Sequence, residues 1–197
     1  MHAFSRTGLV VTVLACGLAV GCGKNPAAPS QNTPPTLPTV DPAAVVFLEN
    51  FDAENNGVGI YNWANLANWN VLAGCIDLHG NDFFDVQPGA GLYVDLDGTC
   101  DAGATIETKT AFTLPAGTYV FEFFMAGNQR HDTSDTVIVN VGSLFQEQFV
   151  LQPRDQFVLR TRTISVPAQT TARIRFQNLG GDLQGALVDL VRLRRQS

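Results

Sequence analysis

Residues 118–126 (TYVFEFFMA) constrain the fold of this chain more than any other stretch of its sequence. The segment is built from β-branched and aromatic side chains, which favour extended strands. Apolar residues occupy both of its alternating faces, so a strand here needs protein on both sides. The segment therefore predicts a central strand of a sheet that is covered by a second layer.

Several other segments alternate polar and apolar residues, as a strand with one solvated face does. The clearest are residues 160–166 (RTRTISV), residues 173–176 (RIRF) and the valines at positions 137, 139 and 141. No segment has a sustained helical period, although residues 62–70 are expected to hold one short helical turn. Further strands are expected near residues 45–48, 69–73, 91–96, 104–110, 144–151 and 185–193.

Turn-forming pairs such as Pro88-Gly89 and Asp97-Gly98 separate the predicted strands. Eight to ten strands at this spacing predict an all-β fold, an antiparallel β-sandwich. Jelly-roll connections are expected, because they cover one core with two sheets and leave loops free at the ends. In the last strand, regular alternation places Leu187, Asp189 and Val191 on one face.

The first 21 residues carry the pattern of an export signal. One cation, Arg6, precedes an uncharged run from residue 7 to residue 21 that is too short to span a bilayer. The sequence LAVGC at residues 18–22 resembles the lipobox of bacterial lipoproteins, in which the cysteine is lipidated and becomes the mature N-terminus. This resemblance implies lipidation of Cys22, attachment to a membrane, and a place in the bacterial cell envelope, at the outer membrane or cell surface. Cys16 is a second candidate, and an ordinary secretory signal is the alternative.

Composition divides the chain into three parts. Residues 1–21 form the signal peptide. Residues 22–40 are rich in Pro, Ser, Ala and Thr, and they bury too little apolar surface to offset their chain entropy, so they predict a flexible tether. Residues 41–195 have a globular composition and are long enough for one hydrophobic core. We expect this last part to be a single β-sandwich domain of a binding type.

Charge is distributed unevenly along the chain, which carries a formal net charge of −6. Ten carboxylates and no Lys or Arg lie between residues 41 and 101, whereas eight arginines follow residue 153. A protein this acidic has no electrostatic basis for binding nucleic acid. Most of the carboxylates are expected at the solvated surface, and a few are candidates for a hard cation such as calcium.

Two cysteines, Cys75 and Cys100, remain once Cys22 is lipidated and the signal is removed. In an exported protein, two remaining cysteines most simply form a disulfide. The rival interpretation, a reactive thiol pair, lacks the C-x-x-C spacing. Zinc is not expected, because the mature chain holds only His79 and His131 and no cluster with ligand spacing.

Short motifs follow one another along the globular part in a recognisable order. They are ENFD at 49–52, WNV at 69–71, GLYVDLDGT at 91–99, AGTY at 116–119, AGN at 126–128 and GALVDLV at 185–191. This order resembles the galactose-binding-like jelly-roll domains of secreted bacterial proteins, including proteins with PEP-CTERM sorting signals. It is also similar to cell-wall-associated domains of unknown function in plants and, more distantly, to carbohydrate-binding modules. The resemblance covers about residues 45–193 and implies the same fold.

The resemblance also implies a structural calcium ion, shared by an acid near the first strand and an aspartate in the last strand. Matching by motif, Glu49 and Asp189 are the expected ligands, with Asp52 next. An aspartate inside so apolar a strand needs a partner. The alternative is that Asp189 accepts hydrogen bonds from the backbone or from an arginine, and both interpretations stay open.

The segment YNWANLANWN at residues 61–70 supplies aromatic rings and amides in a predicted loop. Sugars are bound by aromatic faces together with amides and carboxylates that hydrogen-bond their hydroxyls. Tyr61 and Trp63 are therefore expected to contact a glycan. Trp69, at the start of a predicted strand, is expected in the core.

Other candidates for the same cleft come from distant parts of the sequence. Asp95 is expected to face a ligand or an ion, and Asn128 begins a polar stretch, residues 128–131, that ends a buried strand and is a candidate rim. The pair Phe83-Phe84 is expected to form a hydrophobic plug under a loop, and the alternative is that it forms another wall of the ligand-binding loops.

Catalysis is not expected. The sequence has no nucleophile elbow, metal-ligand motif or phosphate-binding loop, and abundant carboxylates alone do not define a glycosidase. We expect a lipid-anchored exported domain with a non-catalytic binding surface for carbohydrate. The alternative is a structural or adhesive envelope protein that binds a protein partner, and a glycosidase comes third.

Overall fold

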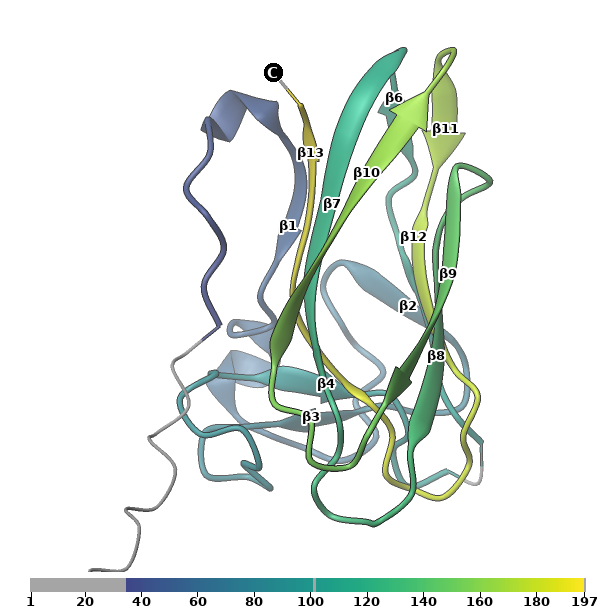
Figure 1. The fold of residues 1–197 in the computed structure, drawn as a ribbon. Helices are drawn as coiled ribbons and strands as arrows, with labels where there is room; N and C mark the ends of the chain where they lie inside the picture. The colour runs from purple at the N-terminus through teal and green to yellow at the C-terminus, as the bar shows by residue number, and fades with distance from the viewer. Residues whose placement is uncertain (1–34, 101, 197) are drawn as a thin grey trace, which may run out of the picture. The chain divides into compact units, whose positions relative to one another are not determined.

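The computed structural model describes residues 35–100 and 102–196, and every structural statement below concerns these residues (Figure 1). The predicted signal peptide, Cys22 and most of the predicted tether lie outside the described residues. Within the described part, no helix has the length and apolar character needed to cross a membrane.

The described chain forms thirteen strands and two short 3-10 helices. In chain order they are η1 (Pro42–Ala44), β1 (Val45–Glu49), η2 (Glu54–Gly57), β2 (Trp69–Ala73), β3 (Asp77–His79), β4 (Tyr93–Asp95), β5 (Thr105–Thr108), β6 (Phe112–Leu114), β7 (Gly117–Ala126), β8 (Asp135–Val141), β9 (Phe145–Leu151), β10 (Val158–Val166), β11 (Thr170–Ala172), β12 (Ile174–Asn178) and β13 (Leu187–Arg195). The prediction of a helical turn within residues 62–70 is wrong, because this segment is irregular and then enters β2.

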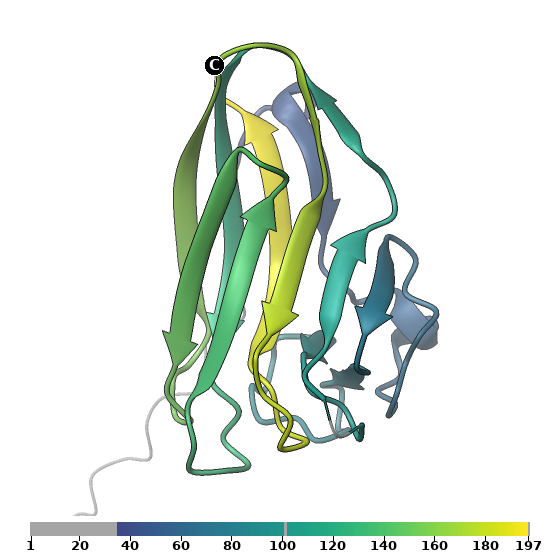
Figure 2. The same cartoon turned by 90° about the vertical axis from the view of Figure 1, so that its right-hand side faces the viewer.

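Two antiparallel sheets enclose one main core (Figures 1 and 2). The first sheet has the strand order β10-β7-β13-β4-β3, and β1 also pairs with β13. The second sheet has the order β2-β5-β12-β8-β9, and a small ladder joins β6 to β11. The prediction of an all-β antiparallel sandwich is therefore confirmed.

Strand β7 contains the apolar stretch 118–126 and lies between β10 and β13. On its inner face, the Phe121 and Phe123 rings lie 6.4 and 5.4 Å from the ring of Phe176 in the second sheet. These contacts join the two layers across the core, as a strand that is apolar on both faces requires.

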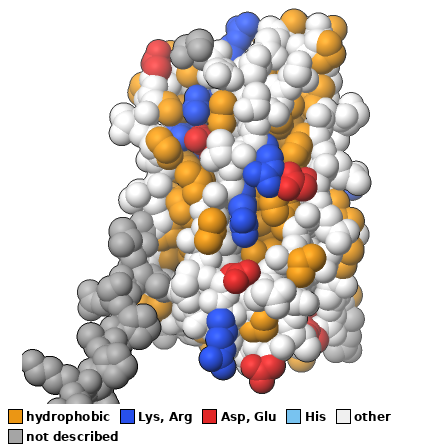
Figure 3. Space-filling model, in the orientation of Figure 1, with side chains coloured by type: hydrophobic (Ala, Val, Ile, Leu, Met, Phe, Trp, Pro, Cys, Tyr) orange, Lys and Arg blue, Asp and Glu red, His pale blue; other side chains and the backbone are white. Residues whose placement is uncertain are grey.

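The outer face of β7 is covered as well. Glu122 accepts hydrogen bonds from Nε of Arg192 (2.8 Å) and Nε of Arg194 (3.1 Å) on the neighbouring strand β13. Arg192 also donates from Nη1 to the carbonyl oxygen of Pro38 (2.9 Å), so the segment before η1 contacts this face. Figure 3 shows basic and acidic side chains beside one another on the molecular surface in this view.

Strand β13 departs from regular alternation. Leu190 has a φ of 46°, and the register against β7 shifts by one residue just after Asp189. Val188 and Val191 consequently both enter the main core, whereas Leu187 packs in a smaller separate cluster. The predicted common face of Leu187, Asp189 and Val191 is therefore wrong, because a bulge turns over the residues that follow it.

The predicted disulfide is confirmed. The sulfur atoms of Cys75 and Cys100 are 2.01 Å apart and the Cα atoms 5.7 Å apart. The bridge fastens the segment between β2 and β3 to the loop between β4 and β5. The carbonyl oxygen of Cys75 also accepts the backbone N–H of Gly98 (2.8 Å), so these two segments are joined covalently and by hydrogen bonding.

Candidate functional site

Three aromatic side chains from the loops after η2 and β3 form a surface cluster, which we call the aromatic loop site. The ring centroids lie 4.9 Å apart for Tyr61 and Phe83, 5.4 Å for Tyr61 and Phe84, and 5.1 Å for Phe83 and Phe84. Tyr61 is 40% exposed and Phe84 is 45% exposed, whereas Phe83 is partly buried. The Tyr61 ring is thus accessible to solvent. The expected plug of two phenylalanines is half right, because Phe84 faces solvent.

The backbone that presents Phe84 is unusual. Asn81, Asp82 and Phe84 have φ values of 50°, 71° and 45°, in the left-handed region that a bulky side chain disfavours. Two backbone hydrogen bonds between Gly80 and Phe83, of 2.9 and 3.0 Å, close the turn. Strain of this kind persists where the surroundings enforce it, and it is concentrated at functional sites.

A buried polar network supports the aromatic loop site. The Phe84 ring stacks on His79, with centroids 5.8 Å apart and planes inclined by 29°. The guanidinium carbon of Arg130 lies 4.9 Å from the Phe84 centroid, and its Nη1 lies 3.2 Å from Nε2 of His79. The same Nη1 lies 3.4 Å from Oδ2 of Asp95. Arg130 therefore connects the aromatic surface to the interior.

Asp95 and Asn128, both expected in the binding site, are brought together but are fully buried. Asn128 donates from Nδ2 to Oδ2 of Asp95 (2.8 Å), and Oδ1 of Asp95 accepts the backbone N–H groups of Asp97 and Gly185. The backbone N–H of Arg130 donates to Oδ1 of Asn128 (3.3 Å). Both side chains therefore contact Arg130 from the protein interior and do not reach the surface themselves.

Burial determines the charge states in this network. It lowers the pKa of His79 to about 3, and the charge of Arg130 acts in the same direction, so the ring is neutral near pH 7. Arg130 then donates to Nε2, which assigns the ring proton to Nδ1. Burial raises the pKa of Asp77, and it raises that of Asp95 well above its ordinary value, while backbone donors oppose both shifts.

Trp63, the second aromatic residue expected to contact a glycan, is partly buried. Its ring packs against the main core, and Nε1 donates to Oε2 of Glu54 (3.2 Å). Oε1 of Glu54 accepts the backbone N–H of Ala67 (2.6 Å), so Glu54 fixes the loop that follows it. Trp69 lies in the core, as predicted.

His131 also differs from the expected rim of the cleft. Its ring nitrogens lie 3.4 Å from Oδ2 of Asp135 and 3.6 Å from Oδ2 of Asp182. Burial raises the pKa of Asp135 to about 7, and the charges of Asp182 and Asp97 add to this shift. These contacts form a separate acidic group, which does not include Phe84 or Arg130.

The three acids predicted to bind calcium gather where the first and last strands meet. Glu49 in β1 pairs with Val191 in β13, which brings it near Asp189. Asp189 is buried, and its Oδ2 has no hydrogen-bond partner in the described part of the chain. Burial, opposed by the backbone N–H of Leu190 and aided by the nearby charges of Asp52 and Glu49, raises the pKa of Asp189 to about 8.

The other two acids already accept hydrogen bonds. Oε1 of Glu49 accepts the backbone N–H of Phe51 (2.9 Å), and Oδ1 of Asp52 accepts the N–H of Leu92 (3.0 Å). Within residues 35–100 and 102–196, no group of three or more His, Cys, Asp or Glu residues is spaced to hold a metal ion. The donor types and the unpaired oxygen of Asp189 fit calcium, whereas the spacing is not that of a formed coordination shell.

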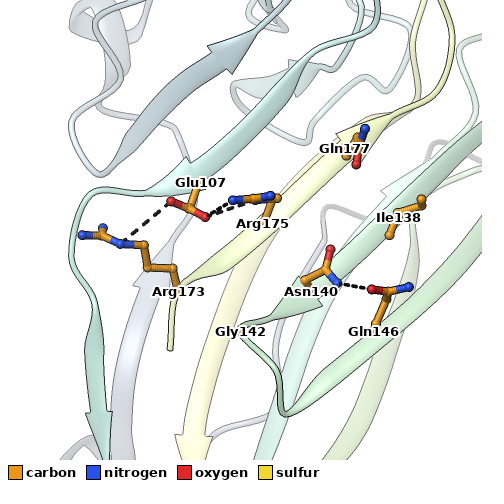
Figure 4. Close-up of a pocket in the computed structure, with 8 residues that line it drawn as sticks. All are labelled: Glu107, Ile138, Asn140, Gly142, Gln146, Arg173, Arg175 and Gln177. Atoms are coloured by element: carbon orange, nitrogen blue, oxygen red, sulfur yellow. Dashed lines mark hydrogen bonds and ion pairs between the residues drawn. The ribbon is translucent and has the colours of Figure 1, made fainter. Parts of the chain in front are cut away.

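A concave region, which we call the sheet hollow, lies on the outer face of the second sheet (Figure 4). It has a volume of about 410 Å³. No sequence motif indicates this hollow, because each of its strands carries an ordinary polar face. It is lined by Glu107, Ile138, Asn140, Gly142, Gln146, Arg173, Arg175 and Gln177.

No family model and no curated protein matches this sequence. The structure is similar to the K1 cleaved adhesin domain of Lys-gingipain from Porphyromonas gingivalis W83, with 18% identity and a TM-score of 0.50 over 77% of this chain and 98% of that domain. It is also similar to the carbohydrate-binding module CBM6cm-2 from Cellvibrio mixtus lichenase 5A in complex with cellotriose (14% identity, TM-score 0.43, 72% of this chain and 98% of that one). A family 35 carbohydrate-binding module from Clostridium thermocellum gives 14% identity and a TM-score of 0.44 over 71% of this chain and 99% of that one. The fold is thus a jelly-roll β-sandwich.

Proposed function

We propose that this protein is a lipid-anchored, exported domain that binds carbohydrate, without catalysis, at the aromatic loop site. The observation that carries the proposal is the exposure of Tyr61 and Phe84 on a loop surface. Half-exposed rings offer flat apolar faces to the C–H faces of a sugar. The left-handed backbone at Phe84 supports the same conclusion. The turn holds Phe84 in a backbone conformation that bulky residues disfavour, and in this conformation the ring is exposed.

Arg130 supplies the polar half of the site. Its Nη1 faces the buried network, whereas Nε and Nη2 have no partner among the described residues. These donors are available to sugar hydroxyls beside the Phe84 ring. A small number of oriented polar groups next to an apolar surface is the usual composition of a ligand site.

A glycan array with the mature protein tests the proposal. Wild type is expected to retain at least one neutral glycan, and Tyr61→Ala and Phe84→Ala are each expected to lose that retention. Leu72→Ala is the matched control, because Leu72 is an apolar residue of β2 that is 51% exposed. The proposal is wrong if wild type retains no glycan, or if both aromatic variants behave like the control.

Lipid attachment at Cys22 is part of the proposal and rests on the sequence LAVGC. Cells that express the full chain are grown with an alkyne-labelled fatty acid. Wild type and Cys16→Ser are expected to incorporate the label, and Cys22→Ser is expected to lose it. Label that persists in Cys22→Ser and disappears in Cys16→Ser would move the attachment to the other cysteine.

Calcium bound by Glu49, Asp52 and Asp189 is the third part of the proposal. The ion would neutralise a buried carboxylate that has an unpaired oxygen, and it would hold the first strand to the last.

A further inference from the structure

The sheet hollow contains a continuous row of polar side chains across four strands (Figure 4). Arg175 in β12 lies directly opposite Glu107 in β5 on one side and Asn140 in β8 on the other. Asn140 in turn lies opposite Gln146 in β9. Because neighbouring strands are about 4.8 Å apart, the row extends over roughly 14 Å. This is an elongated surface, suited to several units of a chain.

The two arginines of the hollow are held in place and still have free donors. Arg175 donates to Oε2 of Glu107 from Nε (3.1 Å) and from Nη2 (2.7 Å). Arg173 has its Nε 3.8 Å from Oε1 of Glu107, and its Nη1 donates to the carbonyl oxygens of Thr108 and Lys109. No described residue bonds Nη1 of Arg175 or Nη2 of Arg173. Their side chains are 44% and 38% exposed, so these groups face solvent.

Charge in the hollow favours an anion. Arg173 and Arg175 carry two positive charges against the single carboxylate of Glu107, and no other charged residue lines the hollow. A guanidinium that is already fixed by one carboxylate loses little conformational entropy when it binds another. Charge-assisted hydrogen bonds to carboxylates are about twice as strong as neutral ones.

The remaining lining residues favour a hydroxylated chain over a simple anion. Asn140, Gln146 and Gln177 each present an amide, which donates to and accepts from hydroxyl groups. The Asn140 amide donates to Oε1 of Gln146 (3.0 Å), which orients both side chains along the row. None of the eight lining residues is aromatic, so the hollow lacks the stacking surface that distinguishes the aromatic loop site.

We propose that the sheet hollow is a second binding site, for acidic oligosaccharides that carry carboxylates, as uronic acid chains do. Arg175 and Arg173 bind a carboxylate of the chain, and the amides of β8, β9 and β12 bind hydroxyls of adjacent units. The inference rests on the proposed function in one respect only, namely that the ligand is a saccharide. It uses none of the residues of the aromatic loop site.

Isothermal titration of the mature protein tests this site with three probes of matched length: an oligogalacturonate, a neutral galacto-oligosaccharide and oligoglutamate. Wild type is expected to bind the oligogalacturonate, less tightly as salt rises. Arg175→Gln is expected to weaken this binding at least about ten-fold, as the loss of a charge-assisted hydrogen bond implies. Arg154→Gln is the matched control, because Arg154 is exposed and does not line the hollow.

A second variant separates ligand contact from charge. Asn140→Leu is expected to weaken oligogalacturonate binding and to leave its salt dependence unchanged, since no charge is removed. Thermal melts confirm that each variant is folded. The proposal is overturned if wild type does not bind the oligogalacturonate, if Arg175→Gln binds it as tightly as Arg154→Gln does, or if oligoglutamate binds equally well.

The test of the sheet hollow and the test of the aromatic loop site can succeed or fail independently. Tyr61→Ala and Phe84→Ala are expected to bind the oligogalacturonate as wild type does, even where they lose neutral glycans. If neutral glycans are never retained while Arg175 is needed for the acidic one, the aromatic loop site fails and the sheet hollow stands.

Discussion

The guanidinium carbon of Arg130 lies 4.9 Å from the centroid of the Phe84 ring. Through this contact, one side chain joins an exposed aromatic surface to a buried group of polar residues. On the buried side, Nη1 of Arg130 lies 3.2 Å from Nε2 of His79 and 3.4 Å from Oδ2 of Asp95. The position of Phe84 therefore depends, through Arg130, on the buried side chains of His79 and Asp95.

Replacing Arg130 by methionine is expected to lower both stability and carbohydrate retention. The variant removes one donor from the buried carboxylate of Asp95, which costs about 1–3 kcal/mol in the free energy of unfolding. It also removes the cation beside Phe84. Urea unfolding and the glycan array measure the two effects. Arg154→Met removes an exposed arginine of the same size, and an equal loss in that control would contradict the role of Arg130.

The left-handed backbone at Phe84 predicts that glycine is more stabilising than alanine at this position, the reverse of the usual order. Glycine normally destabilises a chain relative to alanine, but at a φ of 45° the Cβ of alanine is itself unfavourable. Phe84→Gly is therefore expected to be more stable than Phe84→Ala by about 1 kcal/mol, measured as a difference in urea unfolding. Phe83, whose φ is not positive, is expected to show the usual order. Greater stability of Phe84→Ala would show that the turn does not constrain this residue.

Asp189 predicts how stability depends on pH without calcium. Its pKa is about 8 in the folded protein and near 3.8 in the unfolded chain. Between these values the folded state holds a proton that the unfolded state has released, so stability falls as pH rises from about 4 to about 8. Asp189→Asn has no carboxylate to ionise, so its stability does not fall in this way. In EDTA at pH 8, its free energy of unfolding is expected to exceed that of wild type by at least about 1 kcal/mol, and this difference shrinks toward pH 4.

With calcium present, wild type is expected to be more stable than Asp189→Asn. The ion binds the ionised carboxylate of the folded state, so millimolar calcium raises the melting temperature of wild type and not that of Asp189→Asn. Asp132→Asn, a change at an exposed aspartate, is the control and is expected to respond as wild type does. If calcium leaves the wild-type melting temperature unchanged, these acids do not bind the ion.

The disulfide predicts a loss of stability that leaves the binding surface intact. Opening the loop closed by Cys75 and Cys100, which are 25 residues apart, is expected to cost about 3–4 kcal/mol in the chain-entropy model. The double variant Cys75→Ser/Cys100→Ser should therefore melt at a lower temperature. Below that temperature it should retain the same glycans, because neither cysteine belongs to the aromatic loop site. A melting temperature equal to that of wild type would contradict this expectation.

Features that depend on local pattern were predictable from the sequence. The alternation of residues 160–166 and the apolar stretch 118–126 identified β10 and β7, because side-chain direction in a strand has a period of two. The cysteine count identified the disulfide without any knowledge of the fold. The resemblance to jelly-roll domains placed Glu49 and Asp189 near each other, although 140 positions separate them in the chain.

Features that depend on three-dimensional context were not predictable. Phe84 was expected under a loop, and a turn of left-handed residues places it in solvent. The sequence does not show that Asp95 and Asn128 are buried. A buried carboxylate needs hydrogen-bond donors, and these come from remote parts of the chain. The sheet hollow depends on the register of four strands, and no single strand shows it.

The pairing of β1 with β13 determines how the domain responds to mechanical load. The chain enters β1 at Val45, opposite Arg194 at the end of β13, and the Asp95 network lies at the other end of β13, opposite Leu187 (Figure 1). A pull on the N-terminal segment first strains the contact between Pro38 and Arg192. A load carried between the N-terminal segment and the opposite end of β13 runs along the strand axis, so the hydrogen bonds of the β1–β13 ladder share it and are not broken one pair at a time. The ladder therefore joins the N-terminal segment mechanically to the end of β13 that pairs with β4.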